Sequence, residues 1–365
     1  MTDKEIFMKQ SKRSTYQLNN AKRNKKDEFY TQLSDIENEL KYYRKHFKNK
    51  VVYLNCDDSE SNFFKYFTMY FDVLGLKKVI ATYYDDKKPT YKLEVSRNIY
   101  KDGKYDESGI IKTRLRGNGD FKNAENIELL KEADIVVTNP PFSLFIDHLT
   151  QIMEYNKKFI VIGNITAVGY NALFPWIYEG KIWTGVGFNI SMTFRIPNNY
   201  EKYTFKDEEG NKYSKLGGIA WYTNLEHNKY KESFIETVAK ESYDPKKYPK
   251  YDNYDAIDVD QVKNIPYDYY GEMGVPITFL GKYNPDEFEI IALGKGKGAN
   301  TFKPTKYYPK ALYYNKSHLL KNVKAELNNV VVLKINAPIF GKSYYQIGDN
   351  YYRVPFTRLI IKRRK

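Results

Sequence analysis

Short apolar runs alternate with amphipathic segments along the first half of the chain. Four runs are apolar enough to be buried strands: VVYLN (51–55), KKVIATYY (77–84), DIVVT (134–138) and KFIVIGN (158–164). Four other segments place apolar residues at helical spacing: 34–48, 63–75, 123–133 and 143–153. Ser34 and Glu37 form a predicted capping box for the first helix, and Gly75 is predicted to close the second. Strands that alternate with helices predict an α/β fold with a mostly parallel sheet and flanking helices.

The pattern changes at three places. Residues 85–118 alternate on either side of an Asp-Gly pair at 102–103, which predicts an inserted hairpin. Residues 181–227 alternate like an antiparallel pair, and beyond 228 the patterns are weak and Tyr, Lys, Asp and Pro dominate. We therefore expect a basic arm over 1–27, an α/β domain over 28–227 that contains the hairpin, and a second, mixed region over 228–365.

Composition excludes several classes of protein. The chain has 365 residues, of which 42% are hydrophobic, so it can bury a sizeable core. No apolar run is long enough to span a bilayer, and the N-terminus lacks the apolar core of a secretory signal, which predicts a cytoplasmic protein. The single cysteine, Cys56, excludes an internal disulfide framework, and with four scattered histidines no metal site is predicted.

The charge balance favours a polyanionic partner. Lys and Arg number 59 against 45 Asp and Glu, which gives a formal net charge of +14. Neutralising phosphates releases condensed counterions, so nucleic acid is the leading candidate partner. A solvated basic surface without such a partner is the alternative. The 36 tyrosines, interleaved with lysines in KYYPKALYYNK (306–316), suit either base stacking or an ordinary amphipathic surface.

The loop after DIVVT is the strongest chemical signal. In open parallel sheets, ligands bind beyond the carboxyl ends of the strands, and this loop reads Asn139, Pro140, Pro141 and Phe142. The prolines fix their own φ and keep the preceding residues extended, so the loop is rigid. The Asn139 side-chain oxygen and the Pro140 carbonyl can then accept both hydrogens of a planar exocyclic amine, while Phe142 stacks on the ring. An isolated tetrapeptide could be a simple turn, but the preceding strand and the following helix favour a site.

Such a loop suits methyl transfer to nitrogen. An exocyclic amine is a poor nucleophile because its lone pair is delocalised, and two fixed acceptors localise that pair during attack on a sulfonium methyl. Methylation at cytosine C5 needs a thiolate instead, and Cys56 lies in another loop without a preceding proline. The loop alone leaves the acceptor open among adenine in DNA or RNA, cytosine N4 and a protein glutamine amide. A binding module without turnover is a further alternative.

The loop also carries a family resemblance. NPPF after a strand resembles motif IV of the amino-methyltransferases that use S-adenosylmethionine, and several longer stretches resemble the EcoRI-type adenine-specific DNA methyltransferases. These stretches are DEFYTQLSDIENEL (27–40), VVYLNCDDSESNFFKYF (51–67), ADIVVTNPPFSLF (133–145), IAWYTNL (219–225) and YDNYDAIDVDQVKNIPYDYYGEMGVPITFLGKYNP (251–285). The resemblance implies a class I methyltransferase sheet, which is Rossmann-like, and a C-terminal DNA-recognition region. It also implies S-adenosylmethionine as cofactor and N6-methylation of an adenine extruded from double-stranded DNA.

The resemblance assigns individual residues to the cofactor pocket. The implied cofactor-binding residues are Phe29, Tyr30, Thr31, Asn55, Asp57, Asp58, Asp120 and Phe121. Phe29 to Thr31 match the family's F-Y-T segment, and Asp120 resembles the residue that accepts from the adenine amine of the cofactor. As alternatives, Asp57 and Asp58 could cap the helix that follows them, and Asp120 could close a turn. The loop after VVYLN lacks the glycines that most methyltransferases place there.

The remaining expectations concern DNA and partners. Lys22, Arg23, Lys25 and Lys26, together with the region beyond about 168, are the candidate DNA contacts, whereas His148 and His227 are interpreted as structural. Asp85 is predicted either to reach the ribose or to face water. Family likeness suggests a short, symmetric, A/T-centred target. It leaves open a paired restriction endonuclease, without direct contact, or an orphan regulatory role, and we expect a monomer.

Overall fold

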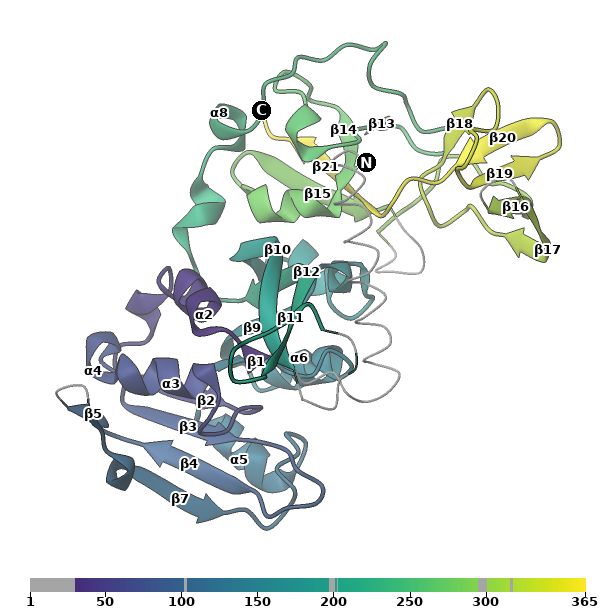
Figure 1. The fold of residues 1–365 in the computed structure, drawn as a ribbon. Coiled ribbons are helices and arrows are strands. Elements are labelled where there is room, and N and C mark those ends of the chain that lie inside the picture. The colour runs from purple at the N-terminus through teal and green to yellow at the C-terminus, as the bar shows by residue number, and fades with distance from the viewer. Residues whose placement is uncertain (1–29, 102–103, 197–200, 202, 295–300, 316–317) are drawn as a thin grey trace. The chain divides into compact units, whose positions relative to one another are not determined.

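The computed structural model describes residues 30–101, 104–196, 201, 203–294, 301–315 and 318–365. The predicted basic arm, with Lys22, Arg23, Lys25 and Lys26, lies outside the described residues, as does Phe29. The chain divides into two compact units (Figure 1). Unit 1 comprises the described residues up to Ile165 together with Ile182–His227, and unit 2 comprises Thr166–Lys181 together with the described residues from Asn228 onward.

Unit 1 is built on one large sheet. Its strands are β1 (Tyr30–Thr31), β2 (Val51–Leu54), β3 (Lys78–Thr82), β4 (Tyr91–Val95), β7 (Ile110–Arg114), β8 (Ile135–Thr138), β9 (Lys158–Asn164), β10 (Trp183–Ile196), β11 (Phe205–Lys206) and β12 (Lys212–Thr223). Among the described residues their order is β1-β10-β12-β9-β8-β2-β3-β4-β7, and β11 pairs with β12. The four predicted apolar runs are confirmed as β2, β3, β8 and β9. Within this set, β9 pairs with β8, β8 with β2 and β2 with β3, and all three pairs are parallel. The flanking strands are antiparallel, so the sheet is mixed.

The strand order reverses at β2. The chain passes from β2 to β3 on one side and later enters β8 on the other side of β2. Because β4 is antiparallel to both β3 and β7, β7 points the same way as β3. The carboxyl ends of β2, β3, β7 and β8 therefore lie at one edge of the sheet, where open α/β sheets bind their ligands.

Helices cover both faces of this sheet. They are α2 (Leu33–Leu40), α3 (Asn62–Met69), α4 (Phe71–Leu74), α5 (Ala124–Glu132) and α6 (Phe145–Glu154), with the 3-10 turns η1 (Arg44–His46) and η2 (Glu107–Gly109). The crossovers β2-α3-β3 and β8-α6-β9 step in opposite directions along the sheet. With the usual right-handed crossover, this places α3 and α6 on opposite faces (Figure 1).

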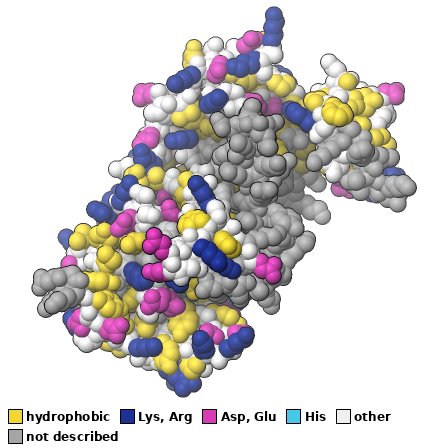
Figure 2. Space-filling model, viewed as in Figure 1, with side chains coloured by type: hydrophobic (Ala, Val, Ile, Leu, Met, Phe, Trp, Pro, Cys, Tyr) yellow, Lys and Arg dark blue, Asp and Glu magenta, His cyan; other side chains and the backbone are white. Residues whose placement is uncertain are grey.

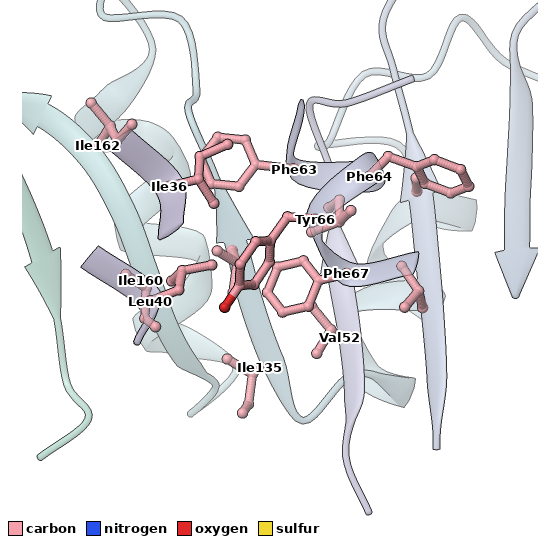
Figure 3. Packing of buried hydrophobic residues seen from close by; sticks show 14 of the residues in the cluster. Ile36, Leu40, Val52, Phe63, Phe64, Tyr66, Phe67, Ile135, Ile160 and Ile162 are labelled. Carbon is pink, nitrogen blue, oxygen red and sulfur yellow. The ribbon is translucent and has the colours of Figure 1, made fainter. Parts of the chain in front are cut away.

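Aromatic side chains fill the core beneath α3. Phe63, Phe67 and Tyr66 are at most 2% exposed, and the rings of Tyr66 and Phe67 meet edge to face at 5.2 Å. Figure 3 shows these two rings between Leu40 of α2 and Val52 of β2. Burial of this many apolar side chains anchors α2 and α3 to the sheet and so fixes the loop between β2 and α3.

Two helix predictions were wrong in detail. The first helix begins at Leu33 after Gln32, so Ser34 lies inside it and the predicted capping box is not formed. This helix ends at Leu40 rather than at 48, and the turn η1 then brings the predicted apolar position Phe47 into the core without a continuous helix. The second helix is broken at Tyr70, although Gly75 closes α4 with φ 61° as predicted.

The segment 85–118 extends the sheet rather than standing apart from it. β4 pairs with β3, and β7 pairs with β4. Between them, β5 (Tyr100–Lys101) pairs with β6 (Lys104–Tyr105) on either side of the Asp-Gly pair. The antiparallel pair predicted over 181–227 is present as β10 and β12.

Unit 2 contains two smaller sheets. The first has the order β13 (Ile257–Asp258), β14 (Glu272–Pro276), β21 (Arg358–Arg363) and β15 (Phe288–Leu293). The second has the order β17 (His318–Ala325), β16 (Ala311–Asn315), β19 (Tyr344–Ile347), β20 (Asn350–Arg353) and β18 (Leu333–Ile335). The helical segments are η3 (Ile165–Gly169), α7 (Phe174–Tyr178), η4 (Asn228–Lys231), α8 (Phe234–Thr237), η5 (Val262–Asn264) and η6 (Ile277–Lys282).

A buried ion pair lies inside the first of these sheets. Arg358 donates to Asp258 at 2.9 Å, and Tyr251 donates to the same carboxylate oxygen at 2.6 Å.

Within the part of the chain that the structure describes, no helix is long and apolar enough to cross a membrane. The same residues contain no group of three or more His, Cys, Asp or Glu side chains placed to hold a metal ion.

Candidate active site

A cavity of about 470 Å³ lies at the carboxyl edge of the parallel strands. It is formed by the loops that follow β2, β3, β7 and β8, together with β1 and the start of α3. Its lining residues are Tyr30, Thr31, Asn55, Cys56, Asp57, Asp58, Ser61, Asn62, Phe63, Tyr83, Tyr84, Gly119, Asp120, Phe121, Asn139, Pro141, Ser143 and Leu144. The volume is within the range of small-molecule and cofactor sites.

Most of the predicted site residues that the structure describes meet in this cavity. Seven of the implied cofactor residues line it, and Asn139 and Pro141 line it as well. Pro140 and Phe142 are not among the lining residues. Two loops far apart in the sequence, after β2 and after β8, therefore contribute to one cavity wall.

The NPPF loop is anchored by its buried members. Pro140 is buried, whereas Asn139 and Pro141 are half-buried. The backbone N–H of Leu144 donates to the Pro141 carbonyl at 2.9 Å, which turns the chain into α6. Phe142 is only 4% exposed and belongs to the same core cluster as Phe63 and Phe67 of α3. Phe142 is not among the residues that line the cavity, and its predicted stacking on a base stays a prediction.

Asp57 is a buried residue in the cavity wall. One oxygen accepts from the Ser61 hydroxyl, and the other accepts from Thr138 Oγ1 at 2.6 Å. Burial raises the pKa of Asp57 to about 7, because the two hydroxyl donors only partly offset the lost hydration. Since Thr138 is the last residue of β8, this carboxyl group connects the loop after β2 to the residue directly before Asn139.

Asp58 shapes the turn before α3. One of its oxygens accepts from the backbone N–H groups of Glu60 and Ser61, at 2.9 and 3.1 Å. The N-cap of α3 is Ser61, whose hydroxyl oxygen accepts from the Phe63 N–H at 3.1 Å. Neither aspartate is therefore the helix N-cap, although Asp58 satisfies backbone donors in the preceding turn.

Asn55 is held by a histidine behind the cavity wall. The Asn55 side-chain oxygen lies 2.8 Å from His148 Nε2, and both side chains are buried. Burial lowers the pKa of His148 to about 3, so the imidazole is neutral. His227 is also buried, contacts the Thr184 carbonyl at 2.9 Å, and has a pKa lowered by burial. Neither histidine lines the cavity.

A glycine is required in the loop after β7. Gly119 has φ +78°, and a Cβ atom there would lie 1.9 Å from the Tyr83 carbonyl oxygen. This close approach packs the loops after β3 and β7 against each other. The following Asp120 lines the cavity and accepts from the Lys122 N–H at 2.9 Å, which closes a turn. Asp120 was predicted either to contact the adenine amine of the cofactor or to close a turn. The two roles are compatible, because one carboxylate oxygen closes the turn while the residue lines the cavity.

Asp85 does not line the cavity. It accepts from the N–H groups of Lys87 and Lys88 at 2.8 and 3.0 Å, and these bonds lower its pKa. Tyr83 and Tyr84 do line the cavity and were missed, because the predicted strand over 77–84 absorbed them, whereas β3 ends at Thr82. Asn62, directly before the predicted helix 63–75, also lines the cavity and was missed; its amide donates to the Thr31 carbonyl at 2.8 Å and ties β1 to α3.

Comparison with known proteins identifies the family. Residues 17–364 match the family model described as the adenine-specific methyltransferase EcoRI. The chain belongs to this EcoRI methyltransferase family. It is 47% identical over 293 residues to the Type II methyltransferase M.EcoRI of Escherichia coli, across 76% of this chain and 89% of that protein.

Two further relatives come from mycoplasmas. The Type II methyltransferase M.MgeORF184P of Mycoplasma genitalium is 41% identical, across 76% of this chain and 86% of its own length. M.MpnI of Mycoplasma pneumoniae, also a Type II methyltransferase, is 42% identical, across 75% and 84% respectively. This member of the EcoRI family is thus an adenine-specific DNA methyltransferase of the restriction–modification type. The family resolves the choice of acceptor that the NPPF loop alone left open.

Proposed function

We propose that unit 1 is a class I methyltransferase domain that transfers a methyl group from S-adenosylmethionine to N6 of an adenine extruded from duplex DNA. The observation that carries this proposal is the shared cavity. Its wall contains both the implied cofactor residues after β2 and Asn139 of the NPPF loop. A donor and an acceptor amine can therefore be held side by side at the edge of the sheet, next to the strand-order reversal.

The cavity residues fit the cofactor. Thr31 Oγ1 is a buried polar atom with no hydrogen-bond partner within the described ranges, and it lies in the cavity wall. Asn55 and Asp120 add polar groups, while Tyr30 and Phe121 add aromatic surface. These residues suit a ligand that combines a purine, a ribose and a charged amino-acid part. When bound, S-adenosylmethionine supplies a methyl group on a cationic sulfur that is open to attack by nitrogen.

Asn139 and Pro140 position the acceptor amine. The Asn139 side-chain oxygen and the Pro140 carbonyl accept its two hydrogens, so the nitrogen lone pair is directed away from the loop. As the nitrogen–carbon bond forms, the sulfur–carbon bond breaks, and the extra proton leaves the amine for solvent. His148 is unsuited to act as a base because it does not line the cavity, it is bonded to Asn55, and burial lowers its pKa to about 3, so that the ring does not retain an added proton. The protein's contribution is positioning and preorganised dipoles.

Access to N6 requires that the adenine leave the duplex. Unpairing and unstacking one base costs a few kcal/mol, which contacts to the flipped base and the backbone offset. We infer that unit 2 contains the target-recognition surface. The arm residues Lys22, Arg23, Lys25 and Lys26 contact phosphates in this proposal, as the net charge of +14 favours. A restriction endonuclease of the same specificity is the inferred functional partner, without direct contact.

The test is product analysis. The protein is incubated with S-adenosylmethionine and unmethylated genomic duplex DNA, the DNA is digested to nucleosides, and N6-methyladenine is measured by mass spectrometry. We expect N6-methyladenine with the wild-type protein and a loss of at least about a hundredfold with Asn139→Ala, because the amine loses one of its two acceptors. Asn98→Ala, at an equally half-buried asparagine outside the cavity, is the matched control. Full activity of Asn139→Ala would contradict the amine-positioning role.

A further inference from the structure

Two buried side chains brace the NPPF loop against the loop after β2. Thr138 directly precedes the NPPF loop, and His148 lies in α6, which follows it. Both are 0% exposed, and neither lines the cavity. Thr138 bonds to Asp57 at 2.6 Å and His148 bonds to Asn55 at 2.8 Å. Their partners are both in the cavity wall, on the side where the implied cofactor residues lie.

The direction of the second bond follows from protonation. The low pKa of His148 leaves one ring nitrogen with a hydrogen, and the Asn55 oxygen can only accept, so Nε2–H is the donor. The Asn55 amide nitrogen is then left to donate to a ligand in the cavity. His148 Nδ1 has no hydrogen-bond partner within the part of the chain that is described, so its bond to Asn55 is the polar contact that orients the ring.

We propose that Thr138 and His148 are positioning residues that couple cofactor binding to the binding of the target base by the NPPF loop. A ligand against Asn55 and Asp57 restricts these side chains, and through the two bonds it restricts Thr138, directly before the NPPF loop, and α6, the helix after it. The target base then meets a loop that has already lost its conformational freedom and binds more tightly. By linkage, the base strengthens cofactor binding by the same factor. This inference rests on the proposed function of the cavity.

The test measures the factor by which one ligand raises the affinity of the protein for the other. The ligands are S-adenosylhomocysteine, which permits binding without turnover, and a duplex that the wild-type protein methylates, with 2-aminopurine at the target adenine. Titration calorimetry gives the affinity for S-adenosylhomocysteine with and without the duplex, and 2-aminopurine fluorescence reports base extrusion with and without S-adenosylhomocysteine. We expect the wild-type affinities to rise about tenfold in the presence of the second ligand.

The variants separate coupling from simple structural support. Thr138→Val and His148→Phe are each expected to reduce the factor to about twofold or less, while S-adenosylhomocysteine still binds. Thr138→Ser keeps the hydroxyl and is expected to restore the wild-type factor. Thr223→Val is the matched control, because Thr223 is an equally buried threonine that donates to the Phe159 carbonyl at 2.7 Å, outside the cavity. It is expected to lower stability and keep the coupling.

The outcomes distinguish this inference from the proposed function. A wild-type factor near one, or unchanged coupling in Thr138→Val, overturns the inference alone. Absence of S-adenosylhomocysteine binding by the wild-type protein overturns the proposed function and the inference together. If His148→Phe does not fold by circular dichroism, Thr138→Val and its serine counterpart decide the question.

Discussion

Asp57 is a residue whose surroundings favour the protonated carboxyl group. Its pKa is raised from 3.8 to about 7 by burial, so between about pH 4 and pH 7 the folded protein binds more protons than the unfolded chain. The stability that this group contributes is fully present below pH 4 and is lost as the pH rises through 7. Between pH 5 and pH 8 we expect the Tm of Asp57→Asn to decrease less than the Tm of the wild type. The difference between the two decreases should be roughly 3–6 °C.

The control uses a carboxyl group with the opposite shift. Backbone donors lower the pKa of Asp85, so its contribution is constant above pH 5 and is lost only at lower pH. Asp85→Asn should therefore follow the wild-type curve between pH 5 and pH 8. Thermal unfolding at four pH values measures both differences. Parallel curves for the wild type and Asp57→Asn would show that Asp57 titrates at an ordinary pH.

Residues at the site were predictable where they lie at or just beyond the end of a predicted strand. Asn139 directly follows one, Asn55 is the last residue of another and Asp57 lies two residues beyond it, and the carboxyl ends of parallel strands share one edge. The contact between His148 and Asn55 joins residues 93 positions apart, and no local pattern specifies such a pairing. Gly119 was missed because its requirement comes from the Tyr83 carbonyl in another loop. Burial of Phe142 was also unpredictable, since the motif indicates an aromatic ring but not which way it faces.

Among the elements, β10 depends on the buried carboxyl group of Glu39 from α2, whose pKa is raised to about 7 by burial. The register of β10 against β12 shifts between Thr184 and Phe188, and Glu39 occupies this irregularity. Its two oxygens accept from the N–H groups of Val186 and Gly187 at 2.8 and 2.7 Å, and Tyr43 donates to one of them at 2.9 Å. A Cβ atom at Gly185 would lie 2.4 Å from a Glu39 carboxyl oxygen and 2.5 Å from the Trp221 Cβ atom, which favours glycine there.

Removal of this side chain leaves buried donors without an acceptor. We expect Glu39→Ala to lower the free energy of unfolding by about 3 kcal/mol, measured by urea denaturation. Tyr43→Phe removes one donor and keeps the carboxylate, so it should cost about 1 kcal/mol. An effect of Glu39→Ala no larger than that of Tyr43→Phe would contradict the bridging role of Glu39.

The central strands of unit 1 were predictable because their buried residues follow one another without interruption in the sequence. All four residues of β2, and all four of β8, are buried, so each reads as an unbroken apolar run. In unit 2 the pattern fails for a physical reason. Strands such as β16 and β19 are four or five residues long, and in each only the first residue is buried, so neither apolar runs nor strict alternation mark them. The predicted capping box failed because Ser34 and Glu37 match its spacing, while the N-cap is Gln32, two residues before Ser34.

At the scale of the whole molecule, the charge distribution bears on DNA binding, and on one face basic and acidic side chains are interspersed. Figure 2 shows Lys and Arg side chains over the visible face, with acidic side chains between them. Several exposed lysines lie near the amino ends of the parallel strands, at the edge opposite the cavity: Lys45, Lys48, Lys77 and Lys158. A dispersed surplus attracts DNA without choosing a site, so phosphate contacts near the target require a local concentration of charge. The basic run at 22–26 supplies one in the sequence.

Salt dependence of DNA binding tests whether that run contacts phosphates. Each phosphate contact adds about 0.9 to the slope of log affinity against log salt concentration, because a condensed counterion is released. We expect replacement of Lys22, Arg23, Lys25 and Lys26 by Gln to reduce this slope by about 3, as measured by fluorescence anisotropy with duplex DNA between 50 and 300 mM salt. The matched control replaces the four lysines at the opposite edge. It removes the same formal charge, so long-range attraction falls equally, while the slope should stay within about one of the wild type. Equal slopes for the two variants would mean that the run acts only through net charge and makes no phosphate contacts.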